Sequence, residues 1–326
     1  MNMFFFHPFP GEEGPCHRRL LLITFVLTVA CFSPLQAQQG SDVQMRNQEL
    51  QTQGQSSLRK FEGQFDGDEN EDFSQLLTLK RSKSWYITPF ASASGFWTSN
   101  PLLASRGAKG GDTVFSETQG LDAGYRFTPD WQIQAGCSYQ MTRYDKNPFL
   151  DADARSANIS TSFQLPANWQ LTMGVRGLWL TSPHMGVELY RENNPFASVS
   201  QSWSFFDSRL NLVYGYEYDH KFTNPVGFDR DEHTVFTGLS YGWLPELASQ
   251  LVLRQNTQFY DFRPSTAPVN GRQEWVSSVV LQTVWQPLPW MQLRAFGISS
   301  YDNSVNAASD YKVINAGGEL RFFWKF

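Results

Sequence analysis

Apolar and polar residues alternate strictly along several stretches of the chain after residue 84. In residues 131–141, Trp131 and Ile133 occupy the odd positions, while Gln132 and Gln134 occupy the even ones. Successive side chains of a β-strand point to opposite faces, so this pattern predicts a strand with one apolar and one polar face. The length of the stretch is that of a tilted strand crossing a bilayer, about 9–11 residues.

The same apolar–polar alternation recurs from residue 84 to the end of the chain, in some stretches regularly and in others less so. It predicts twelve strands, at 85–97, 117–127, 131–141, 156–165, 169–179, 198–205, 210–218, 235–243, 248–260, 275–285, 290–300 and 311–326. Short connections, several with proline, alternate with long polar ones at 98–116, 142–155, 181–197, 219–233, 261–273 and 301–310. An even number of strands joined in this way predicts an all-β fold, an antiparallel transmembrane β-barrel with short periplasmic turns and longer extracellular loops.

The last predicted strand carries the most specific pattern. Leu320, Phe322, Trp324 and Phe326 share its apolar face, and the chain as printed ends on that phenylalanine. In a barrel surrounded by lipid the apolar face points outward, and the last strand pairs with the first. An amphipathic edge strand of a soluble β-sandwich is the alternative interpretation.

This ending resembles the closing strand of Gram-negative outer-membrane β-barrel proteins, and the pattern over about 85–326 is similar to that of their porin-like members. The resemblance implies that Phe322, Trp324 and Phe326 form the signal that the barrel-assembly machinery recognises. It also implies a location in the outer membrane of a Gram-negative bacterium, in contact with lipid and lipopolysaccharide. Barrels of this kind include some associated with polysaccharide export, so that role is left open.

The beginning of the chain predicts export. Arg18 and Arg19 precede an apolar run that is too short to span a bilayer, and the small residue Ala37 follows it. This arrangement is typical of a secretory signal peptide, here residues 1–37. A lipoprotein anchored through Cys31 is the alternative.

A polar region follows the predicted signal peptide. Residues 38–83 are rich in Gln, Ser, Asp and Glu and show no apolar periodicity. Such a composition cannot bury enough apolar surface to fold alone, which predicts a disordered polar periplasmic tail. The domain order is therefore signal peptide, tail, and a barrel at 84–326.

Composition narrows the function classes. The formal net charge of −5 argues against nucleic acid as a partner, and the aromatic content of 15% suits the two interfacial girdles of a barrel. Cys137 is the one cysteine after the predicted leader, so neither an intrachain disulfide nor a cysteine-based metal site is expected. No cofactor and no metal ion are predicted.

Strand alternation also indicates which charged side chains face the lumen. Five arginines and three acids form the predicted pore lining: Arg126, Arg176, Arg254, Arg294, Arg321, Asp122, Glu217 and Glu319. A confined polar pore with excess arginine predicts a passive channel for small polar solutes, anionic or sugar-like. Because twelve strands lie between filled eight-stranded barrels and open porins, a plugged structural or adhesive barrel is the alternative.

Catalysis is the second function class to consider. His184, His220 and His233 follow the leader, and all three fall in predicted loops, the last two beside acids. Such pairs suit acid–base chemistry, but no nucleophile stands at a recognisable spacing. We therefore assign no catalytic residue and predict a non-enzyme, with a lipid-modifying enzyme as the less favoured alternative. A homo-oligomer is also left open.

The terminal strand generates a test of assembly. Deleting Phe326, or replacing it by Asp, should lower the yield and the insertion rate of heat-modifiable barrel, because the terminal aromatic residue belongs to the predicted assembly signal. Pulse-labelling followed by membrane fractionation measures both quantities, with Phe326→Tyr as the conservative control. Equal insertion of all variants would contradict this role.

Overall fold

The computed structural model describes residues 43–50, 84–104, 110–206, 208–261, 271–305 and 310–326. Within these ranges the chain forms a short helix, 43–50, and twelve strands. The strands are β1 (Trp85–Thr98), β2 (Asp112–Thr128), β3 (Trp131–Tyr144), β4 (Ala152–Leu165), β5 (Trp169–Thr181), β6 (Glu188–Phe205), β7 (Leu210–Asn224), β8 (Arg230–Leu244), β9 (Leu247–Tyr260), β10 (Gln273–Leu288), β11 (Met291–Ser304) and β12 (Tyr311–Phe323). Three short 3-10 turns join them: η3 (Pro148–Leu150), η4 (Pro166–Asn168) and η5 (Val226–Phe228).

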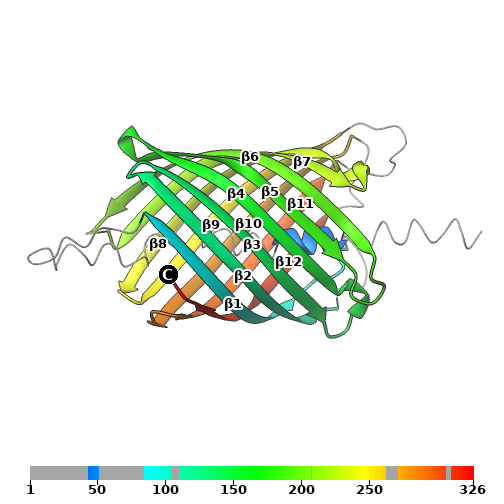
Figure 1. Ribbon diagram of the computed structural model, residues 1–326. Helices are drawn as coiled ribbons and strands as arrows, with labels where there is room; N and C mark the ends of the chain where they lie inside the picture. Colours follow the sequence, from blue (N-terminus) through cyan, green and yellow to red (C-terminus); the bar gives the residue numbers. More distant parts are fainter. Residues whose placement is uncertain (1–42, 51–83, 105–109, 207, 262–270, 306–309) are drawn as a thin grey trace, which may run out of the picture. The chain divides into compact units, whose positions relative to one another are not determined.

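The strands close into a ring in which each pairs antiparallel with its neighbours in sequence, and β1 pairs with β12 (Figure 1). The predicted twelve-stranded antiparallel barrel is therefore confirmed. Closure matters because a lipid-exposed sheet edge would leave backbone N–H and C=O groups without partners. All described strands have two neighbours, so no such edge is present among them.

The seam between β1 and β12 depends on the C-terminus. The register pairs Phe90 with Phe323, and the backbone N–H groups of Trp324 and Phe326 donate to Pro89 and Ile87 at 3.1 Å each. The terminal aromatic residues thus continue the ladder beyond the strand itself. Phe322, Trp324 and Phe326 lie on the outward parity of β12, as the alternation predicts.

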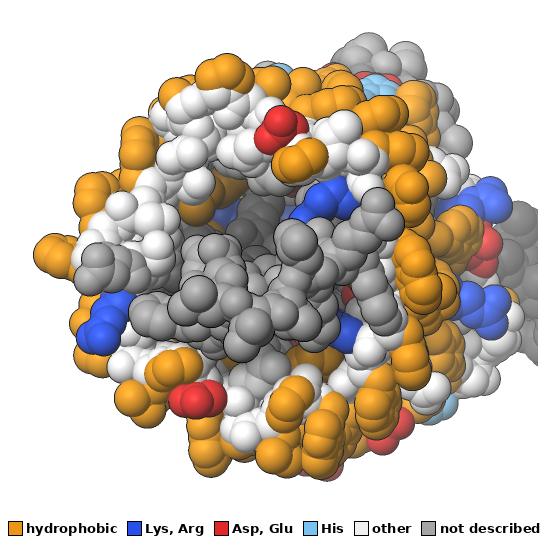
Figure 2. Space-filling model, turned by 60° about the vertical axis from the view of Figure 1, so that its left-hand side comes forward, with side chains coloured by type: hydrophobic (Ala, Val, Ile, Leu, Met, Phe, Trp, Pro, Cys, Tyr) orange, Lys and Arg blue, Asp and Glu red, His pale blue; other side chains and the backbone are white. Residues whose placement is uncertain are grey.

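The faces of the wall are inverted relative to a soluble protein. Outward residues in the middle of the wall are large, apolar and exposed, for example Val235, Leu253 and Leu281. Their inward neighbours along the same strands, such as Thr234 and Gln282, are polar and buried. Figure 2 shows the hydrophobic side chains around the perimeter of the barrel. A water-soluble barrel would show the opposite arrangement, so this wall is built for lipid.

Aromatic side chains gather where the short turns lie. Trp131 stacks on Phe127 with ring centroids 4.2 Å apart, and Trp290 stacks on Phe322 at 6.0 Å. The two tryptophans suit the membrane–water interface because an indole ring is apolar apart from its one N–H group. Indeed the Trp131 indole donates to the Thr161 hydroxyl at 2.9 Å. Cys137 is exposed on the outward face of β3, where the alternation placed it.

The strands run further toward the long loops than the sequence pattern indicated. The predicted loop 181–197 is mostly β6, which begins at Glu188, and the predicted loop 219–233 contains the end of β7 and the start of β8. These loop assignments were wrong because both faces are polar there. Outward Asn193 and inward Glu192 give no apolar–polar alternation, although the backbone stays paired.

The predicted disordered tail 38–83 needs a correction over eight residues. Residues 43–50 form a helix, and six of them are buried. Residues 38–42 and 51–83, like the predicted signal peptide 1–37, lie outside the described residues. None of the helices described is long and apolar enough to cross a membrane.

The wall analysis generates a test of membrane depth. Leu281, near the middle of β10, and Leu244, beside the β8–β9 turn, are both more than half exposed on the outer face. Leu281→Arg should cost about 2–4 kcal/mol of folding free energy in vesicles, and Leu244→Arg about 0–1 kcal/mol, because charge is costly only deep in the bilayer. Reversible urea unfolding in vesicles measures the difference. Equal losses would refute this depth assignment.

Candidate channel interior and its helix

The barrel interior is the candidate functional site. All eight predicted pore-lining residues lie on the inward parity of their strands: Asp122, Arg126, Arg176, Glu217, Arg254, Arg294, Glu319 and Arg321. Their position on the inner face follows from the alternation alone. Their role as a pore lining stays a prediction.

The structure places several of these arginines next to acids. Arg176 lies 3.3 Å from Glu217 and 3.2 Å from Asp219, and its guanidinium stacks on Phe196 at 3.7 Å from the ring centroid. The Asn194 amide donates to Asp219 at 3.1 Å. This arrangement neutralises Arg176 locally and holds its guanidinium flat against the wall.

A second group of charges lies across β2, β11 and β12. Arg294 forms an ion pair with Glu319, and Arg321 lies 3.9 Å from Asp122. Arg321 also stacks over Phe90, at 4.6 Å from the ring centroid. The paired arginines therefore form mixed patches with acids, and the wall does not present a ring of bare positive charge.

Sequence reasoning missed most of the inward acids. Six more carboxylates occupy inward, buried positions: Asp112, Glu192, Asp219, Glu232, Glu274 and Asp302. The bases Lys221, Arg230 and Arg272 are buried beside some of them. Apart from Glu274, which directly precedes the predicted strand 275–285, these residues lie in segments that were assigned to loops. Extending the inward–outward alternation of each strand beyond its apolar stretch would have placed these residues on the inner face.

The helix 43–50 lies inside the barrel, at the end that carries the longer loops (Figure 1). Its Arg46 forms ion pairs with Glu274 of β10 at 2.7 Å and with Asp302 of β11 at 2.8 Å. Arg272 also contacts Glu274, at 2.9 Å. We call Glu274 and Asp302 the acidic clamp.

Glu49 of the same helix has the opposite surroundings. It forms ion pairs with Lys221 of β7, at 2.7 Å, and with Arg230 of β8. Within the wall, Glu232 joins the two bases, at 2.9 Å from Lys221 and 2.6 Å from Arg230. We call Lys221 and Arg230 the basic clamp. The helix is therefore held through one base, Arg46, and one acid, Glu49, which are three residues apart in the sequence.

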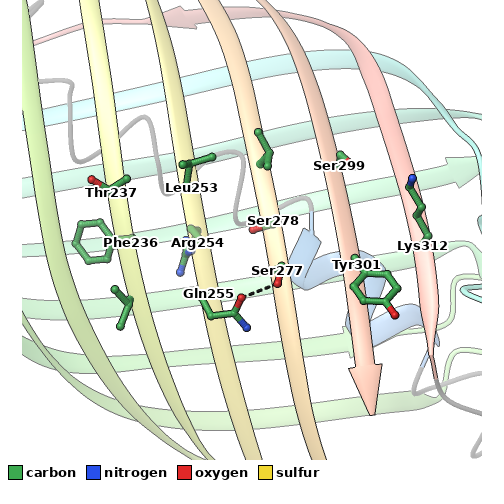
Figure 3. Close-up of a pocket in the computed structure, with 12 residues that line it drawn as sticks. Phe236, Thr237, Leu253, Arg254, Gln255, Ser277, Ser278, Ser299, Tyr301 and Lys312 are labelled. Atoms are coloured by element: carbon green, nitrogen blue, oxygen red, sulfur yellow. Dashed lines mark hydrogen bonds between the residues drawn. The ribbon is translucent and has the colours of Figure 1, made fainter. Parts of the chain in front are cut away.

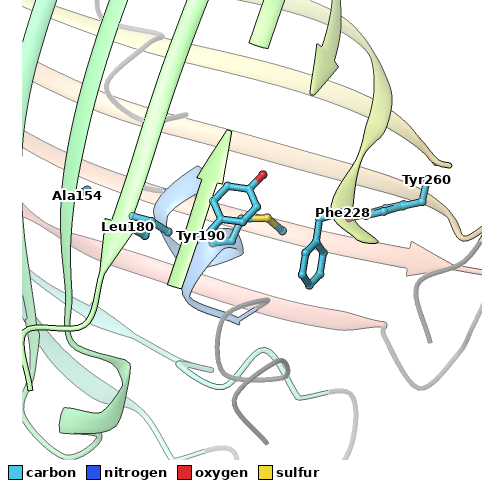
Figure 4. Packing of buried hydrophobic residues seen from close by; sticks show 6 residues of the cluster. Ala154, Leu180, Tyr190, Phe228 and Tyr260 are labelled. Carbon is cyan, nitrogen blue, oxygen red and sulfur yellow. The ribbon is translucent and has the colours of Figure 1, made fainter. Parts of the chain in front are cut away.

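Apolar packing fixes the helix between these clamps. Met45 is fully buried in a cluster with Leu180, Tyr190, Phe228 and Tyr260 (Figure 4). Tyr190 and Phe228 therefore pack against the helix and against each other, with ring centroids 6.3 Å apart.

Polar contacts complete the fit. Asn47 donates to the Pro101 carbonyl at 2.9 Å, and Gln48 donates to the Gln140 side chain at 2.8 Å. Gln44 donates to the Phe149 carbonyl at 3.0 Å. Nearly every side chain of the helix therefore has a specific partner on the wall or its loops.

A cavity of about 670 Å³ lies elsewhere, along β8 to β12. Most of its lining faces outward, including Gln255, Ser277 and Tyr301, while Arg254 reaches it from the inner face (Figure 3). The Ser277 hydroxyl donates to Gln255 at 2.5 Å. This groove belongs to the lipid-facing surface and is separate from the helix seat.

Two of the three histidines are not in loops, contrary to prediction. His220 lies in β7 and His233 in β8, both with outward parity. Asp231 accepts from the Tyr218 hydroxyl at 2.6 Å and lies 2.7 Å from Nδ1 of His220. The Tyr216 hydroxyl lies 2.6 Å from Nδ1 of His233. Strand pairing brings these groups together on the outer face.

His184 lies in the β5–β6 loop as predicted, 3.0 Å from Asp151. Among the described residues no group of three His, Cys, Asp or Glu side chains is arranged to hold a metal ion.

The comparisons with known proteins find a likeness of fold. No protein-family model and no curated protein matches the sequence. The structure is similar to the COG4313 outer membrane channel from Pseudomonas putida F1, at 9% identity and a TM-score of 0.46, covering 77% of this chain and 100% of that one. It is also similar to LpxR from Salmonella typhimurium, at 10% identity and 0.43, covering 73% and 100%, and to the NanC porin, at 12% and 0.40, covering 72% and 98%.

The architecture itself defines the class. A closed antiparallel barrel with an exposed apolar outer band, a polar interior and aromatic residues at the turn end is the design of Gram-negative outer-membrane proteins. The chain is an outer-membrane β-barrel protein.

The buried charges generate a test of stability. Glu232 lies between Lys221 and Arg230 and accepts from Asn256 at 3.0 Å. Glu232→Leu should lower the unfolding free energy by about 3–5 kcal/mol, because two buried bases lose a shared partner. Glu188→Leu, which removes an exposed pair with Arg191, should cost at most about 1 kcal/mol. Urea unfolding in vesicles compares them, and similar losses would disprove the burial argument.

Proposed function

We propose that the protein is a passive channel for small polar solutes across the outer membrane. The observation that carries the proposal is a closed twelve-stranded wall whose inner face bears charged and amide side chains from most strands. Such a lining replaces part of the hydration of a polar solute while the closed backbone excludes lipid.

The five inward arginines alone would predict a preference for anions, but the acids beside them support weaker selectivity. Arg176, Arg294 and Arg321 each have a carboxylate partner, and six further acids occupy inward positions. We therefore propose a mixed lumen with weak selectivity between anions and cations. Sugar-like and zwitterionic solutes suit such a lining because it offers donors and acceptors without a strong net field.

Recording in planar bilayers tests this function. Folded protein should show discrete openings and a reversal potential close to zero in a KCl gradient. Arg176→Gln should shift the permeability ratio toward cations, on the order of twofold, because Glu217 and Asp219 lose their shared base.

Arg143→Gln is the matched control, because Arg143 pairs with Asp153 on the outer face at the same end of the barrel. It should leave the reversal potential unchanged. Silence of the folded protein and of all variants at every voltage would disprove the channel.

Two other functions have an observation in their favour. The helix inside the barrel favours a plugged structural or adhesive barrel, for which the bilayer recording would stay silent. The outward group of Tyr218, His220 and Asp231 favours a lipid-modifying enzyme, since its groups face the acyl chains and headgroups. Phospholipid or lipid A turnover that is lost in His220→Gln would support the enzyme. We also propose lipopolysaccharide, the barrel-assembly machinery and a second copy of this chain as partners of the barrel.

A further inference from the structure

We propose that the helix 43–50 is a built-in, reversible plug, which occupies the loop end of the lumen and must leave its seat before the channel conducts fully. This inference rests on the channel function proposed above and concerns its regulation. It starts from the position of the helix, which makes buried contacts with β7, β8, β10 and β11 and with the β1–β2 loop. A helix with its side chains is about 10–12 Å across, so one that bridges these strands takes up a large part of a twelve-stranded lumen.

The seat is specific to this segment. The acidic clamp receives a guanidinium, the basic clamp receives a carboxylate, and the cluster around Tyr190 and Phe228 receives a methionine. Arg46 and Glu49 are three residues apart, and the two clamps lie on strands separated by β9. A segment of other sequence, or one seated in the reverse direction, would place like charges together.

The wall keeps most of its ion pairs without the helix, which is why the plug can be reversible. Lys221 and Arg230 share Glu232 at 2.9 and 2.6 Å, and Glu274 keeps Arg272 at 2.9 Å. Among the described residues, Asp302 has its ion pair with Arg46. Departure of the helix therefore leaves one wall carboxylate to be rehydrated, while Arg46 and Glu49 regain water.

The chemistry of the clamps also indicates what would release the plug. The ion pairs of Arg46 and Glu49 are mostly buried, so salt screens them much less than it would screen exposed pairs. Neutralising both Arg46 and Glu49 removes these pairs and leaves the wall residues intact, so this double substitution should loosen the seat.

The first experiment reads the position of the helix directly. In a Cys137→Ser background, Asn47→Cys places a thiol on a residue that is buried in the seat. A bulky, water-soluble maleimide should label this thiol slowly in the clamped protein. Labelling should be on the order of tenfold faster after R46Q/E49Q, the factor that corresponds to about 1.4 kcal/mol of lost holding energy. Asn303→Cys, exposed on the outward face of β11, should label rapidly in both forms.

The second experiment records conductance from the same proteins in planar bilayers. R46Q/E49Q should open to a larger conductance, or more often, than the parent. The charge-preserving R46K/E49D should behave nearly as the parent, and R143Q, on the outer face, should change neither readout. Heat-modifiability on gels shows that each variant is folded.

The outcomes separate the plug from the channel. Slow labelling that R46Q/E49Q leaves unchanged would overturn the clamped plug. Faster labelling with unchanged conductance in a protein that does conduct would show that the helix does not obstruct the path, which also overturns it. Faster labelling with silence in every variant would confirm the clamped seat and disprove the channel, and with it the role of the helix in conduction.

Discussion

Backbone hydrogen bonding in a medium without water is the constraint on which this structure depends. Every strand must find two partners, and the last must return to the first, because an unpaired edge in lipid would leave a row of N–H and C=O groups unsatisfied. The contacts of Trp324 and Phe326 with the first strand complete that ring. Closure then leaves an outer face for lipid and an inner face that can hold polar groups, which inverts the pattern of a soluble barrel.

The inverted interior creates an electrostatic problem that the wall solves by pairing. Charges withdrawn from bulk water are costly unless partners of opposite sign lie close by. Arg176 with Glu217 and Asp219, and Lys221 and Arg230 with Glu232, show this arrangement within the wall itself. Such patches leave little net charge on the inner face, so a count of the arginines alone overstates how positive the interior is.

The helix 43–50 extends the same logic to a segment outside the sheet. It brings one base and one acid to a part of the wall that already carries both, and each finds the opposite sign. Its apolar Met45 meets the cluster of Tyr190, Phe228 and Tyr260 that the long loops and the ends of their strands assemble beside it. The contacts that hold this polar segment as a helix come from the barrel wall, so the segment's own composition does not predict them.

The sequence by itself determined the barrel, its strand number and the outward and inward parity of most strands, because these follow from a side-chain alternation with a period of two. It did not reveal where strands end above the membrane, since both faces are polar around Glu192 and Asp219 and the alternation vanishes there. Nor did it reveal the clamps around Arg46 and Glu49 or the outward group of His220 and Asp231. Those depend on which strands become neighbours and in what register, so residues far apart in the chain meet only once the ring has closed.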